Sequence, residues 1–187
     1  MREISEVEVS QYYYLLASLP SLKIGEKPAI TKAQFYSECE KFCTKKDLKA
    51  IKSASLNTKE NSKLSFMKEF CHFREMVNNE MVALRAENLK KDGEKYKNRG
   101  DKETRISEYV RKAVYNENPL EGEKIILALY EGFLADRASG HYFDLDALLI
   151  YALRLDILSR ECLFVTEDGN AEFKRLFDNI KQDIFQI

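Results

Sequence analysis

The chain has 187 residues, of which 44% are hydrophobic and 33% are charged, and its formal net charge is -1. A chain of this length can bury a core without the help of a disulfide or a metal. The near-neutral charge balance argues against a nucleic-acid-binding protein. Three prolines and seven glycines are too few for the many turns of an all-β protein of this length. The composition therefore predicts a globular, helical protein.

The first ten residues are acidic and polar, and they lack the basic and apolar regions of a signal peptide. No apolar run approaches the roughly 18 residues that are needed to cross a bilayer. We therefore expect a soluble, cytoplasmic protein whose four cysteines are free thiols. The most basic stretch is Lys41–Lys52. It is typical of a solvated helix face, and the alternative is a docking patch for an acidic partner.

The N-terminal third predicts three short helices. Gln11–Pro20 is apolar and ends at a proline, and we interpret it as a helix although its three adjacent tyrosines also suit a strand. Thr31 and Gln34 form a capping box that begins the second helix. Thr44 is placed to cap a third helix that ends near Ser55.

The longest helix is predicted from about residue 62 to residue 91, because apolar residues recur there at steps of three and four. Thirty helical residues would extend roughly 45 Å, which is long enough for a spine. The charged segment 92–103 predicts a linker or loop. It would separate an N-terminal helical lobe, residues 1–91, from a C-terminal helical lobe, residues 104–187, and the alternative is a single domain overall.

The C-terminal half predicts four further helices. They are Thr104–Tyr115, Leu120–Ser139, Leu145–Glu161 and a last helix that carries Phe173 and Phe177. The third of these is apolar on most sides, so we expect it to be the buried central helix. The predicted fold class is therefore all-α: a multi-helix bundle with one long helix, built as one domain or as two lobes.

Groups able to catalyse a reaction are scarce. The chain has two histidines, and it contains neither a phosphate-binding glycine loop nor a nucleophile elbow. Cys39, Cys43, Cys71 and His72 are chemically able to bind zinc, but they lack the short knuckle spacing and suit apolar helix faces. We therefore predict no catalytic residue, no cofactor and no metal.

His141 is the other residue that invites a functional interpretation, because it lies in a corner between two predicted helices. It could serve as a contact or acid–base site. The simpler interpretation is a corner in which His141 and Arg137 bond helix-end carbonyls while Asp144 caps the next helix. Asp144 and Asp146 are expected to point to different sides of the helix start.

Two segments resemble a small bacterial family. They are residues 11–20, QYYYLLASLP, and residues 141–160, HYFDLDALLIYALRLDILSR. Members of that family are encoded among the genes of bacterial V-type (A/V-type) ATPases, and they are similar to a reduced form of the V-type C subunit, which is the counterpart of the eukaryotic d subunit. That protein is a helical socket between the central rotor stalk and the membrane ring of proteolipid subunits.

The resemblance implies a non-catalytic subunit or accessory protein of a bacterial V-type ATPase. It would lie peripherally on the inner face of the cell membrane, with the central-stalk subunits and the proteolipid ring as partners. The family has no established active site, so the resemblance implies no catalytic residues. The sequence leaves two alternatives open: a free-standing helical adaptor or assembly factor associated with that ATPase, and an enzyme centred on His141 or on the cysteine group.

A socket of this kind would be lined by large side chains, although for most of them a place in the core is the simpler interpretation. Eight residues are our candidates for partner contact. They are Tyr12, Tyr13, Tyr14, Tyr130, Phe133, His141, Tyr142 and Phe143.

Overall fold

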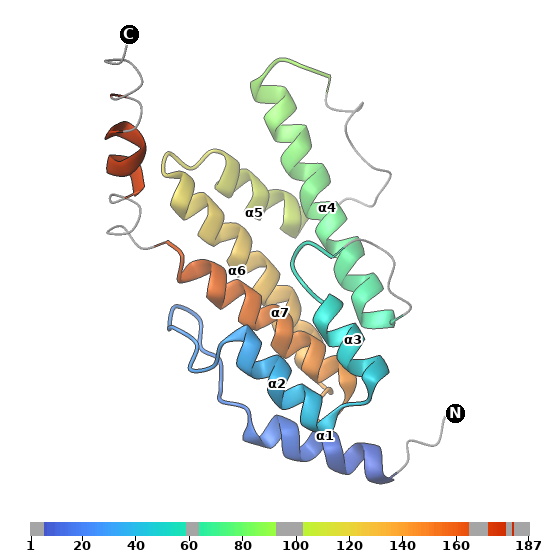
Figure 1. Cartoon of the computed structure of the whole chain (residues 1–187). Coiled ribbons are helices and arrows are strands. Elements are labelled where there is room, and N and C mark those ends of the chain that lie inside the picture. The colour runs from blue at the N-terminus through green and yellow to red at the C-terminus, as the bar shows by residue number, and fades with distance from the viewer. Residues whose placement is uncertain (1–5, 59–63, 93–102, 165–171, 179–180, 182–187) are drawn as a thin grey trace.

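The computed structural model describes residues 6–58, 64–92, 103–164, 172–178 and 181. Within these ranges it is all helical and contains no strand, which confirms the predicted fold class (Figure 1). The labelled helices are α1 Glu6–Ser18, α2 Lys32–Phe42, α3 Lys45–Ser53, α4 Ser65–Asn88, α5 Thr104–Val114, α6 Pro119–Ala138 and α7 Leu145–Glu161. Residues 172–178 and 181 are also helical. None of the described helices is both long enough and apolar enough to cross a membrane.

The helix starts follow local capping chemistry. The Thr31 side chain accepts a hydrogen bond from the backbone N–H of Gln34, and the Gln34 side chain accepts one from the backbone of Thr31, so the predicted capping box of α2 is confirmed. The Thr44 side chain caps α3 by accepting a hydrogen bond from the backbone N–H of Asp47, without the reciprocal bond. Asn118 caps α6, with a proline at the first helical position.

Helix α7 is the centre of the bundle. It contacts α1, α2 and α3 as well as α6, and it begins and ends at the residues predicted for it. Because almost every turn of this helix is apolar, it can be covered on several sides at once. Its buried side chains are Leu148, Leu149, Ile150, Ala152, Leu153, Leu155, Ile157 and Leu158.

Helix α4 is the longest of the described helices, with 24 residues. It is three residues shorter at each end than the predicted range of about 62–91. It packs on α5, and it meets α6 through aromatic side chains, of which Phe73 and Phe133 stack with ring centroids 4.3 Å apart. Buried residues of both predicted lobes form one continuous core. The division into lobes stays a prediction, and most of the predicted linker lies outside the described residues.

At Gly122 the helix α6 lies close against the backbone of α5. A Cβ atom at this position would lie 2.6 Å from the backbone oxygen of Ala113, an atom that cannot swing aside. Alanine is favoured over glycine in a helix by about 1 kcal/mol, but overpacking of this kind costs about 1–3 kcal/mol. The difference is a loss of up to about 2 kcal/mol in the free energy of unfolding of Gly122→Ala, measured by urea denaturation.

Gly132→Ala is the matched control in the same helix. A Cβ atom there would meet only the guanidinium of Arg105 at 3.2 Å, which is the end of a flexible side chain. This substitution should leave the free energy of unfolding unchanged or raise it by up to about 1 kcal/mol. Equal losses in the two variants would show that the approach at Gly122 is not the cause.

Candidate functional site: an exposed aromatic surface

Four of the eight predicted contact residues lie together on the protein surface. Tyr13 and Tyr14 belong to α1, whereas Tyr142 and Phe143 belong to the turn between α6 and α7. The ring centroids of Tyr13 and Phe143 are 4.7 Å apart, so this contact joins two distant parts of the sequence. The distances are 5.7 Å for Tyr13 and Tyr14 and 6.4 Å for Tyr142 and Phe143. We call these four residues the aromatic surface.

The aromatic surface is unusual because its members are large and open to solvent. Their exposed fractions range from 44% to 68%. A single exposed apolar side chain needs no explanation, but contiguous exposed aromatic residues are typical of sites that bind other proteins. A concavity of about 400 Å³ adjoins the surface, between the end of α1 and the first turns of α7. The arrangement offers a partner both projecting rings and a recess beside them.

The helices beneath hold the aromatic surface in place. Leu15 is fully buried in the core and fixes α1. The hydroxyl of Tyr151, in α7, donates a hydrogen bond to the carbonyl oxygen of Pro20 at 2.9 Å. Tyr12 lies on the inner side of α1, where its hydroxyl donates to Asp47 at 3.0 Å. Tyr12 therefore supports the surface and does not form part of it.

Tyr130 and Phe133 lie elsewhere, in the contact between α4 and α6. Their rings lie 6.1 Å from the ring of Phe70, which is fully buried. Burial raises the pKa of Tyr130 to about 12. The two residues follow the apolar stripe of α6, and this stripe faces α4 and not the turn that carries Tyr142.

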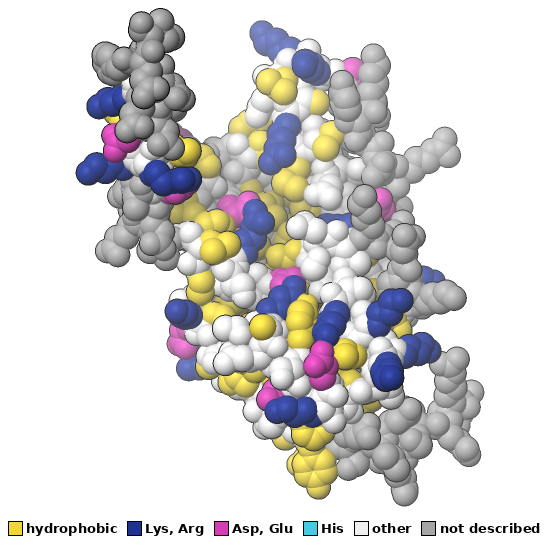
Figure 2. Space-filling model, viewed as in Figure 1, with side chains coloured by type: hydrophobic (Ala, Val, Ile, Leu, Met, Phe, Trp, Pro, Cys, Tyr) yellow, Lys and Arg dark blue, Asp and Glu magenta, His cyan; other side chains and the backbone are white. Residues whose placement is uncertain are grey.

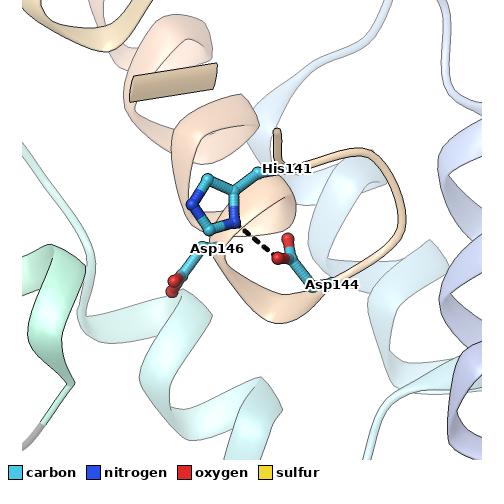
Figure 3. Close-up of side chains that lie close together, drawn as sticks. All are labelled: His141, Asp144 and Asp146. Atoms are coloured by element: carbon cyan, nitrogen blue, oxygen red, sulfur yellow. Dashed lines mark hydrogen bonds and ion pairs between the residues drawn. The ribbon is translucent and has the colours of Figure 1, made fainter. Parts of the chain in front are cut away.

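His141 adjoins the aromatic surface in the same turn. Figure 3 shows its ring facing the carboxylate of Asp144, and Nδ1 and Oδ2 are 2.5 Å apart. The other oxygen of Asp144 accepts a hydrogen bond from the backbone N–H of Ala147, which confirms the predicted cap of α7. The imidazole thus bonds a carboxylate, and only the backbone N–H of His141 donates to a helix-end carbonyl, that of Ala138. The hydrogen bond to Asp144 raises the pKa of His141, and burial opposes this effect.

Asp146 completes a group of three side chains that are able to bind a metal ion. One ligand atom from each of His141, Asp144 and Asp146 lies within 4.8 Å of the others. In Figure 3 the carboxylate of Asp144 faces the imidazole, whereas that of Asp146 points away from it, as expected of two aspartates on different sides of the helix start. Both oxygens of Asp144 already accept hydrogen bonds. The group can therefore be explained as a corner that stabilises the start of α7.

The cysteine group considered as a zinc site does not assemble in the described part of the chain, where His141 and its two aspartates are the only ligand group of the required size. Cys39 and Cys43 lie one turn apart at the end of α2, and the hydrogen bond between them raises the pKa of Cys39 and lowers that of Cys43. The Cys71 thiol instead faces the backbone oxygen of Thr58. All four cysteines are free in the structure.

The corner at His141 makes the stability of the protein depend on pH. Because the pKa of His141 is raised in the folded state, its contribution is fully present below the ordinary value of 6.5 and is lost as the pH rises through the folded-state pKa. The pair is well exposed, so we expect only a few tenths of a kcal/mol between pH 6 and pH 8. Asp144→Asn should remove this dependence and keep the cap. Asp144→Ala should cost about 1 kcal/mol at every pH in this range.

Urea denaturation of the three proteins at each pH measures both effects. A pH dependence that survives in Asp144→Asn would mean that a group other than the pair of His141 and Asp144 is responsible.

The chain matches no known family model, no curated protein and no solved structure. The fold and the surface define an all-helical protein with an exposed aromatic surface. The resemblance of two sequence segments to a family encoded with V-type ATPases stays a prediction from the sequence.

Proposed function

We propose that the protein is a non-catalytic subunit or accessory protein of a bacterial V-type ATPase. The observation that supports this most directly is the position of the two segments that carry the family resemblance. Residues 11–18 lie in α1, and residues 19–20 follow it directly. Residues 141–144 form the corner before α7, and residues 145–160 make up most of α7. The two segments contribute all four residues of the aromatic surface. The resemblance thus falls on one continuous part of the protein.

The chemistry of the aromatic surface suits a protein partner. Tyrosine and phenylalanine give a large contact area for few rotatable bonds, and they are common among the residues that dominate binding energy. The three tyrosine hydroxyls provide hydrogen bonds at the edge of an apolar contact. Central-stalk subunits and the proteolipid ring are the partners that we propose for this surface.

The experiment is affinity purification of the full chain from its native cell in mild detergent, with quantitative mass spectrometry of the recovered proteins. We expect central-stalk, catalytic and proteolipid subunits in a fixed ratio. A variant with Tyr14→Ser and Tyr142→Ser should recover about tenfold less of them, which corresponds to a loss of about 1.4 kcal/mol in binding. Both tyrosines are exposed, so the fold should tolerate the change.

Tyr115→Ser is the matched control, because Tyr115 is an exposed tyrosine at the end of α5, outside the aromatic surface. It should recover the same partners as the parent chain. Recovery of unrelated proteins through the aromatic surface would leave a helical adaptor and exclude the ATPase. Recovery of the chain alone would exclude both proposals.

A further inference from the structure

A long groove lies between α4 and α6, and the end of α5 forms part of its floor. Its volume is about 680 Å³, and Figure 2 shows it as a hollow with apolar side chains inside. The wall on α4 consists of side chains at steps of three and four, namely Arg74, Asn78, Met81, Arg85 and Asn88. At 1.5 Å per residue this wall extends about 21 Å, or roughly four helical turns. The groove therefore has the length of a short helix.

The groove is open because α4 and α6 are joined mainly through α5. Helix α5 packs on both of them. Helices α4 and α6 meet each other through four rings, with centroid distances from 4.3 to 6.1 Å; these are Phe70, Phe73, Tyr130 and Phe133. Beyond the rings, toward the C-terminal end of α4, apolar side chains such as Val114 and Ile126 border the open space. An occupant of the groove therefore needs an apolar face of its own.

The charges that line the groove are unbalanced. Arg74, Arg85 and Arg160 line it against one acidic residue, Glu123, so the lining has a formal charge of +2. Arg160 donates a hydrogen bond to Glu123 at 2.6 Å, and this pair is therefore neutral. The remaining charge belongs to Arg74 and Arg85, neither of which is paired with a carboxylate in the described part of the chain. The groove thus favours an acidic occupant.

Arg74 is held in place and still has a donor to spare. Its Nη1 donates a hydrogen bond to the carbonyl oxygen of Leu56 at 3.1 Å. Its Nε is buried and has no acceptor among the described residues. A buried donor without an acceptor is costly, and an acidic side chain bound beside this guanidinium offers the missing acceptor.

The spacing of Arg74 and Arg85 indicates an extended occupant. The two residues are 11 positions apart on the same wall, which is about three turns and roughly 16 Å along the axis of α4. Two acidic groups three turns apart on a helix match this spacing, whereas a small ligand with one acidic group reaches only one arginine. A nucleic acid is disfavoured because Tyr130, the one ring among the described lining residues, is 8% exposed and offers no face to a base.

We propose that the groove between α4 and α6 is the docking site of an acidic, amphipathic helix that belongs to a partner protein. The apolar face of this helix covers Met81 and Ile126, and its acidic side chains pair with Arg74 and Arg85. The four residues of the aromatic surface are not among those that line the groove, so this is a second, separate contact. The proposal does not rest on the V-type ATPase assignment.

Photo-cross-linking in the native cell tests the proposal with the full chain. The photoreactive residue p-benzoylphenylalanine replaces either Asn78 or Asn88, which are exposed residues of the α4 wall. Tandem mass spectrometry should find both positions joined to one segment of one partner, with apolar residues at steps of three and four and acidic residues about three turns apart. The same label at Lys68, an exposed position of α4 outside the groove, is the matched control and should not give this product.

A synthetic peptide of the cross-linked segment then measures the contribution of charge. Its Kd for the purified full chain, measured by fluorescence anisotropy, should rise about tenfold in Arg85→Glu, which corresponds to roughly 1.4 kcal/mol. Lys68→Glu makes the same charge change outside the groove and should leave the Kd unchanged. The affinity of the parent chain should also fall as added salt screens the ion pairs.

Four results would overturn the proposal. One is a yield from Asn78 and Asn88 no higher than that from Lys68. Another is a cross-linked segment that is basic or lacks the helical apolar spacing. A third is a cross-link to nucleic acid, to a second copy of the chain or to another segment of the same chain. The last is a Kd that Arg85→Glu leaves unchanged or that Lys68→Glu raises equally.

Discussion

Phe70→Ala is expected to lower the free energy of unfolding by about 3–5 kcal/mol, since truncating a buried aromatic ring loses its transfer energy and leaves a cavity. Phe70 is 0% exposed. Its ring lies between α4 and α6, 6.1 Å from the rings of both Tyr130 and Phe133. Small domains have a total stability of about 5–15 kcal/mol, so this one ring accounts for a large part of it. Urea denaturation followed by far-ultraviolet circular dichroism measures the loss.

Phe70→Leu separates the cavity from the loss of an apolar side chain. It keeps most of the buried volume, so we expect it to lose less than half as much stability as Phe70→Ala. Tyr115→Ala, at an exposed aromatic residue, should stay within about 0.5 kcal/mol of the parent. If Phe70→Ala cost less than about 1 kcal/mol, α4 and α6 would not pack through these rings as described.

Helix positions were predictable where the signal is local. Thr31 and Thr44 act through hydrogen bonds to residues three positions away, so the sequence contains the complete interaction. The ends of α4 lack such signals. Leu64 makes no side-chain cap, and the chain leaves the helix with Lys90 at a φ of 51°, where a glycine would normally mark the end. Apolar periodicity alone therefore extended the predicted helix too far.

The candidate site was only partly predictable, because it depends on which helices pack together. Tyr13 and Phe143 are both aromatic, but nothing in their local sequence shows that α1 lies beside the corner before α7. The buried position of Tyr130 was easier to predict, since Tyr130 falls on the apolar stripe of α6 with Ile126 and Leu134. Aromatic character alone did not separate the buried rings from the exposed ones.

The sequence did not predict the groove of about 680 Å³ between α4 and α6, for a related reason. Arg74, Met81 and Arg85 follow helical spacing, but in sequence they read as the solvated face of a long helix. Only the position of α6 opposite them turns that face into one wall of a groove. The unbalanced charge of the groove could be seen only after the two walls were placed together.

Arg154→Met is expected to cost about 2–3 kcal/mol, because it leaves Glu131 ionised, largely buried and unpaired. The Nε atom of Arg154, in α7, lies 2.9 Å from Oε1 of Glu131, in α6. The side chain of Glu131 is only 13% exposed and that of Arg154 is 29% exposed. The N–H of Arg154 Nε makes no hydrogen bond, so the contact is an ion pair without good alignment.

The pKa of Glu131 predicts that removing the charge of Glu131 costs less stability than removing the charge of Arg154. It is raised, because burial outweighs the attraction of Arg154. A carboxyl group with a raised pKa binds its proton more readily in the folded state, so the ionised form is the less stabilising one, and stability rises as the pH falls through the folded-state pKa. Glu131→Gln should therefore stay within about 1 kcal/mol of the parent at neutral pH.

The double variant with Arg154→Met and Glu131→Gln decides between two explanations of the loss in Arg154→Met. If an unpaired carboxylate is the cause, the double variant should recover most of the stability, because no buried charge remains. If packing of the long arginine side chain is the cause, the double variant should be as unstable as Arg154→Met alone. Urea denaturation of the four proteins at neutral pH gives the coupling energy directly, and a value near zero would mean that the pair contributes nothing as a pair.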